Sequence, residues 1–213
     1  MKKLTLLISI TCFTVVAFAQ SEKYMASMKS NIAAIDTSFK NPANLLALAN
    51  KFERIAIAEK NQWLAYYYAA LCQVNYTYME QDKTKIDAIA DKASELIDKA
   101  DSLQPNNSEI SCIKSMIASS HMMVNPMQRY MEYGPESASY IEAAMQQDPT
   151  NPRPEYLKGQ GLKYTHLPFY CCHQLARRSL QRTEQFQNHA QGWRLQPPLK
   201  LANIGPVNLR SKP

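Results

Sequence analysis

The sequence predicts an all-α protein built as an α-solenoid, in which antiparallel helix pairs stack on one another. One pattern recurs 44 residues apart, in Lys99–Glu109 and again in Ala143–Arg153, with Ala, Pro and Asn at matching positions. A helix that ends on a small residue, followed by a Pro–Asn break and a new helix, is typical of the join between units of a helical repeat. The low glycine content, 5 residues among 213, disfavours a turn-rich β protein.

The first 19 residues have the features of a secretory signal peptide. Lys2 and Lys3 form a basic start, an uncharged apolar run follows, and Ala17-Phe18-Ala19 is an A-x-A cleavage site. We therefore expect the mature chain to begin at Gln20 and to be exported, to the periplasm in a Gram-negative source. The apolar run is shorter than the roughly 20 residues that a membrane-spanning helix needs, and no later segment approaches that length.

Apolar residues spaced three and four apart predict a series of helices after the signal peptide. Asn41-Pro42 and Asp82 are expected to start two of them, and Ser108 to cap a third. The helix after Trp63 is apolar on more than one side, which indicates burial between two neighbours. Gly134-Pro135 is expected to end a short helix that begins at Asn125-Pro126. The expected helices span residues 21–39, 42–60, 63–79, 83–103, 109–124, 126–133, 137–147 and 154–164.

Three joins can be superimposed on Asn61, Asn107 and Asn151. Six residues further on lies an apolar column, and eight residues further on lies a column of small residues. The two columns are Tyr67, Ile113 and Leu157, and Ala69, Ser115 and Gly159. Small residues beside apolar ones are what close packing of one helix on its partner requires.

With Asp148–Pro152 as the turn between repeats and Tyr156–Gly159 as part of a first helix, residues 40–165 resemble an exported bacterial tetratricopeptide-repeat protein. The resemblance is partial, because the period is longer than that family's and the additional residues fall in Met122–Glu136. It implies a repeat domain over residues 20–165 whose concave surface, formed by the first helices of successive repeats, binds a partner.

The last part of the chain, residues 166–213, differs in composition. It is rich in Gln and Pro, and it carries the whole of the net charge of +6. We expect a tail with one helix from Leu175 to Phe186 and disorder beyond it; the alternative is a change of reading frame near residue 165. Such a tail would leave Leu157, Leu162 and Tyr164 partly uncovered and allow self-association. With a neutral body, the sequence gives no indication of nucleic-acid binding.

Two clusters contain metal-ligating residue types, but neither forms a complete ligand set. Cys171-Cys172-His173 lacks the Cys-x-x-Cys-His spacing of haem attachment and has no second Cys/His pair for zinc. His121 precedes a group of methionines, Met122, Met123, Met127 and Met131, which we expect to fill packing gaps in the core beneath a loop, because methionine commonly does so. We expect Cys72 and Cys112 to be buried, and we predict no metal and no cofactor.

No catalytic site is evident in the sequence. The motifs of serine hydrolases, zinc peptidases and phosphate-binding loops are absent. The tyrosines at 66, 67, 68, 76 and 78 are expected to be mostly core, with one or two reaching a binding surface. The sequence therefore predicts a non-catalytic exported scaffold that binds a protein or peptide at residues it does not identify. The alternative is an accessory or assembly subunit of a cell-envelope enzyme or transport complex.

Overall fold

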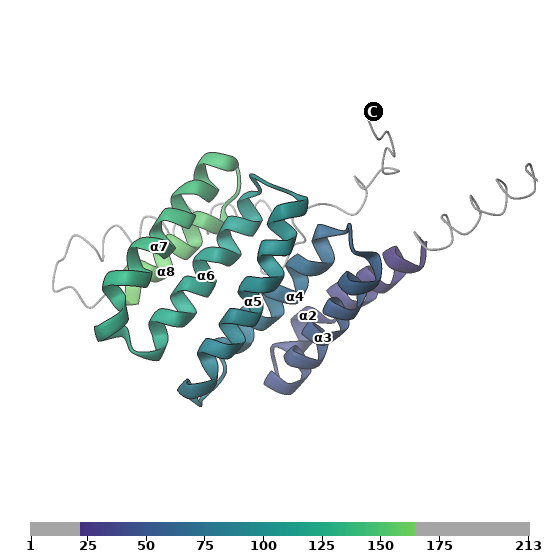
Figure 1. Ribbon diagram of the computed structural model, residues 1–213, viewed down its shortest axis with the longest axis horizontal. Helices are drawn as coiled ribbons and strands as arrows, with labels where there is room; N and C mark the ends of the chain where they lie inside the picture. The colour runs from purple at the N-terminus through teal and green to yellow at the C-terminus, as the bar shows by residue number, and fades with distance from the viewer. Residues whose placement is uncertain (1–21, 165–213) are drawn as a thin grey trace, which may run out of the picture.

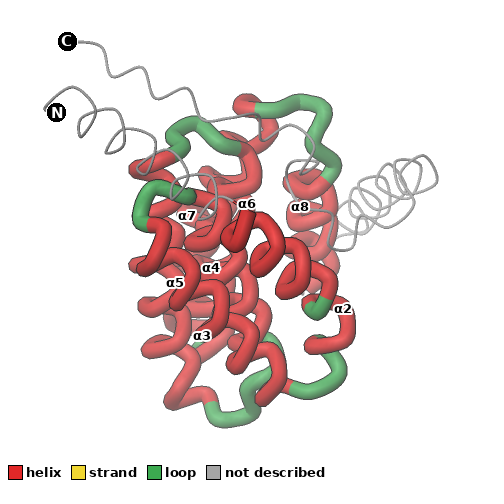
Figure 2. The backbone as a smooth tube through the Cα atoms, turned by 90° about the vertical axis from the view of Figure 1, so that its right-hand side faces the viewer, coloured by secondary structure: helices red, strands yellow, loops and turns green. Residues whose placement is uncertain are grey.

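The computed structural model of the chain describes residues 22–164, and this part is built from helices and connecting loops alone (Figures 1 and 2). The predicted all-α class is confirmed. The expected signal peptide, the tail from residue 166 with its two alternative explanations, and Cys171-Cys172-His173 lie outside the described residues. The helices span residues 22–33, Ile35–Ser38 (α2), Pro42–Glu59 (α3), Trp63–Thr77 (α4), Lys83–Leu103 (α5), Ser108–Val124 (α6), Pro126–Gln147 (α7) and Arg153–Tyr164 (α8).

From α3 onward, each helix packs on the next one in the chain. In Figure 1, α3 to α7 follow one another in sequence order, while α8 overlaps α7 and α6 in that view. In addition, α4 contacts α6 and α6 contacts α8, although a whole helix separates the members of each pair in the sequence. Alternate helices therefore form a contiguous row. Whether these pairs are tetratricopeptide repeats of a solenoid stays a prediction.

Helix α4 is the most enclosed helix of the described part. Twelve of its 15 residues are buried, as its apolar character on several sides predicts. Tyr66, Tyr67 and Tyr68 are at most 8% exposed, and Tyr68 stacks on Phe52 of α3 with ring centroids 5.2 Å apart. The expectation that most of these tyrosines belong to the core is thus met.

Helix starts follow the capping residues of the sequence closely. Asn41 and Asp82 cap α3 and α5 by accepting hydrogen bonds from the backbone N–H groups of Ala43 and Thr84. The cap of α6 is Asn107 and not the expected Ser108. Asn107 accepts from the backbone N–H of Glu109, so Ser108 is the first helical residue, and its hydroxyl donates to the carbonyl of Ala144 in α7.

The two columns identified in the sequence lie mainly in the interior. In the small-residue column, Ala69 is fully buried, Ser115 is 2% exposed and Gly159 is buried. In the apolar column, Tyr67 and Ile113 are fully buried while Leu157 is only partly buried. The superposition of the three joins therefore predicted buried positions on α4, α6 and α8.

The expected break at Gly134-Pro135 is wrong, because α7 runs unbroken from Pro126 to Gln147. Proline inside a helix removes one backbone hydrogen bond and usually costs about 3 kcal/mol. Here the helix continues along α6, where the Ser137 hydroxyl lies 2.9 Å from that of Ser115 and 3.0 Å from that of Ser119. Packing along α6 overrides the local break.

A partly buried polar network joins α4, α6 and α8. The Tyr67 hydroxyl donates to Glu109 Oε2 at 2.8 Å and accepts from Arg153 Nη1 at 2.6 Å. Arg153 also pairs with Glu109 at 2.7 Å, and Asn151 donates to the other oxygen of Glu109 at 2.8 Å. Burial opposes the charge of Arg153, yet the negative partners keep its pKa above the ordinary value. The network satisfies a partly buried ion pair, whose side chains are 14% and 13% exposed, and removing one partner of such a pair is costly.

Removing the hydroxyl of Tyr67 and removing that of Tyr68, its neighbour on α4, should have different effects on the stability of the fold. Tyr67→Phe removes one hydrogen-bond partner from each of the partly buried side chains of Glu109 and Arg153, so we expect the unfolding free energy to fall by about 1–3 kcal/mol. Tyr68→Phe keeps the ring on Phe52 and removes a buried hydroxyl that has no hydrogen-bond partner, so we expect a neutral or stabilising effect within about 1 kcal/mol. Urea unfolding followed by circular dichroism measures both, and equal losses would contradict the network.

Candidate functional site

Exposed large apolar side chains gather where α6 meets α7. The described part exposes seven of them, and four belong to a nine-residue stretch: Met123 (38% exposed), Met127 (92%), Tyr130 (48%) and Met131 (81%). We call these four residues the methionine corner. Scattered exposed apolar residues need no explanation, but a group of them marks a candidate interaction surface.

The expectation that the methionines fill packing gaps is wrong for Met123, Met127 and Met131, which are 38%, 92% and 81% exposed, while Met122 is partly buried. The expected loop above them is absent, because Asn125 alone separates the end of α6 from the start of α7 at Pro126. Met127 and Met131 are one turn apart, so they share a face of α7.

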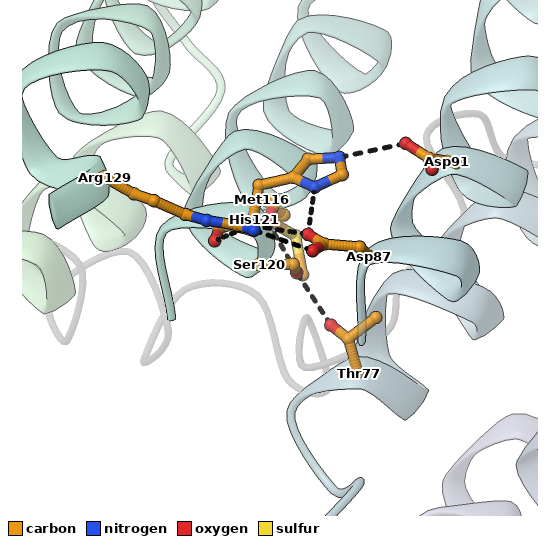
Figure 3. A network of polar contacts seen from close by, with 7 residues as sticks. All are labelled: Thr77, Asp87, Asp91, Met116, Ser120, His121 and Arg129. Carbon is orange, nitrogen blue, oxygen red and sulfur yellow. Dashed lines mark hydrogen bonds and ion pairs between the residues drawn. The ribbon is translucent and has the colours of Figure 1, made fainter. Parts of the chain in front are cut away.

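A polar network fixes the corner by tying three helices together (Figure 3). Arg129 of α7 donates to both carboxylate oxygens of Asp87 in α5, at 2.6 and 2.9 Å, and to the carbonyl of His121 in α6 at 3.0 Å. The two ring nitrogens of His121 face carboxylates, with Nδ1 2.9 Å from Asp87 and Nε2 3.6 Å from Asp91. The hydrogen bonds from Arg129 lower the pKa of Asp87 to about 2, against the opposing effect of burial.

The same network decides which side of α7 faces solvent. Arg129, Tyr133 and Ser137 follow one another at intervals of four residues, and all three contact neighbouring helices: Tyr133 stacks on His121 with ring centroids 5.2 Å apart, and Ser137 bonds to α6. Residues at that spacing share one face of a helix. Met127 and Met131 are therefore directed away from the packed side.

Tyr130 lies between the two methionines and folds along the helix toward Gly134. A Cβ atom at Gly134 would lie 3.2 Å from Cε2 of the Tyr130 ring, which is tighter than ordinary contact. The missing side chain of Gly134 therefore leaves room for the ring. The corner combines an aromatic ring with flexible thioether side chains, which adapt to the shape of an apolar ligand.

Other residues singled out in the sequence take structural roles. His121 is brought to Asp87 and Arg129 and is only 13% exposed. Cys72 and Cys112 are free and buried, as expected, and burial raises the pKa of Cys72 to about 12. Tyr78, at the end of α4, is 40% exposed while its hydroxyl donates to the carbonyl of Met116 at 3.0 Å.

Groups of three or more His, Cys, Asp or Glu placed to hold a metal ion do not occur among residues 22–164. Within the same range, no helix combines the length and the apolar character needed to cross a membrane. These two findings concern the described helices alone.

The chain is similar in structure to the HusA haemophore from Porphyromonas gingivalis. The likeness has a TM-score of 0.67 and 29% sequence identity, and it covers 89% of this chain and 97% of that one. The described fold is all-helical. The structural relative, a haemophore, is a binding protein rather than an enzyme. No protein-family model and no curated protein matches the chain.

Loss of the Asp87 carboxylate should destabilise the corner in a pH-dependent way. The folded-state pKa of about 2 lies below the ordinary 3.8, so this group stabilises the fold above about pH 4 and loses that contribution as pH falls toward 2. We expect Asp87→Asn to lower the melting temperature at pH 7, with a gap from wild type that narrows on acidification. Asp91→Asn is the control, since Asp91 is 71% exposed and lies 3.6 Å from His121. A gap that does not depend on pH would contradict this role.

Proposed function

We propose that this chain is an exported, non-enzymatic carrier of haem or a closely related planar tetrapyrrole. The observation that carries the proposal is the similarity to a haemophore over nearly the whole of both chains, at 29% identity. Export is supported by the signal peptide expected from the first 19 residues. In this proposal the tetrapyrrole is cargo, so the expectation that the protein has no resident cofactor is unchanged.

The methionine corner is the surface we assign to this ligand. A tetrapyrrole is broad, flat and mainly apolar, and Met127, Tyr130 and Met131 present apolar side chains over about one turn of one helix. Binding there would cover side chains that otherwise remain in water, which is favourable by about 1.5–3 kcal/mol for each large side chain fully buried. The network around Asp87 holds α7 in place before binding, so less ordering is required when the ligand arrives.

Two functions predicted from the sequence remain as alternatives to this proposal. One is binding of a protein or peptide partner, and the other is a role as an assembly subunit of a cell-envelope complex. Either partner would also use an exposed apolar surface, so the site alone does not separate them from a carrier role. Direct titration with the free ligand does, because a carrier binds tetrapyrrole without another protein.

The experiment is a titration of the purified mature chain with haemin and, separately, with iron-free protoporphyrin IX, followed by absorbance and by quenching of tryptophan fluorescence. We expect saturable binding of at least one of them. Met127→Glu and Met131→Glu should each weaken it roughly tenfold or more, because a charge on the contact face must be desolvated.

The matched control is Ile57→Glu, which introduces the same charge at an apolar residue of α3 that is 59% exposed. Its affinity should equal that of wild type. Absence of saturable binding by the wild-type chain would contradict the proposed function, and equal weakening by Ile57→Glu would contradict the placement of the site.

A further inference from the structure

The side chains that most commonly ligate haem iron are already engaged or covered in the described part. His121, the single histidine of residues 22–164, lies between two carboxylates under the ring of Tyr133. Cys72 and Cys112 are at most 1% exposed, and burial raises the pKa of both thiols, which disfavours the thiolate that would bind iron. An iron ligand from these residues would require local unfolding.

Two thioether groups, by contrast, are accessible without any rearrangement. Met127 and Met131 are 92% and 81% exposed, and they lie one turn apart on the solvent side of α7. Methionine has three rotatable side-chain bonds and a polarizable sulfur, and thioether sulfur is an established type of haem iron ligand. Tyr130 lies between them in the sequence, on the same turn of α7.

We propose that the sulfur of Met127 or Met131 is an axial ligand of the iron in bound haem. The inference rests on the proposed function and specifies how the same surface recognises its ligand. One sulfur binds at a time, because both side chains approach a flat ring from the same side; the other methionine and Tyr130 contact the macrocycle. A soft thioether ligand favours ferrous over ferric iron, so the bound haem should have a raised reduction potential.

The test replaces sulfur while keeping an apolar side chain of similar size. Haem complexes of the wild-type chain and of the double variant Met127→Leu/Met131→Leu are compared by spectroelectrochemical titration. We expect the double variant to lose at least a tenfold preference for ferrous iron, a midpoint potential lower by 59 mV or more for this one-electron couple. It should also lose affinity for ferrous haem relative to iron-free protoporphyrin IX. Met25→Leu, in the helix over residues 22–33, is the matched control and should leave the potential unchanged.

The outcomes separate the two proposals. If the wild-type chain binds tetrapyrrole and the double variant has the wild-type potential, the thioether ligand is wrong while the carrier function stands. A potential that changes in Tyr130→Phe and not in the double variant identifies a phenol oxygen as the ligand and also overturns the inference. If the wild-type chain binds neither haem nor protoporphyrin IX, the carrier function itself fails.

Discussion

Enclosure of α4 is the constraint on which the rest of the structure depends. A helix that is apolar on several sides cannot remain next to water, and burying it requires partners on each of those sides. Helices α3, α5 and α6 contact it, and its 12 buried residues include the three consecutive tyrosines. The Tyr67 hydroxyl, held by Glu109 and Arg153, extends this order to α8. Packing around one helix thus fixes the positions of helices distant in the sequence.

Away from α4 the interfaces become more polar. Among the 22 residues of helix α7, only Ser137 and Ala144 are buried, and the helix is joined to α6 largely by serine hydroxyls and to α5 by Arg129. Because these polar contacts fix α7 against its neighbours, the helix needs to bury little apolar surface of its own. Its opposite face is therefore free to carry apolar residues for another purpose, and the methionine corner lies on that face. Under the proposed function, structural and binding roles are divided between the two sides of one helix.

Local signals in the sequence were sufficient for most helix boundaries. Asn41-Pro42 and Asp82 act through groups within two residues, so their caps could be predicted without tertiary information. The continuity of α7 and the exposure of its methionines could not, because both depend on contacts distant in the sequence. Arg129 reaches Asp87 across 42 residues, and this pair sets which side of α7 faces solvent. The spacing of Met127 and Met131 alone fits a buried face and an exposed face of a helix equally well. The signal that could have distinguished these two cases is the spacing of Arg129, Tyr133 and Ser137, which follow one another at intervals of four residues on the other side of α7.

We expect the exposed methionines of the α6–α7 corner to contact the ligand. Methyl-labelled methionine NMR of the mature chain, titrated with diamagnetic zinc protoporphyrin IX, measures this contact, because every methionine gives its own signal. Ring-current effects should shift the methyl signals of Met123, Met127 and Met131 strongly, with little change at the buried Met28. Shifts centred on Met28 or on the partly buried Met79, with the corner signals unmoved, would contradict it.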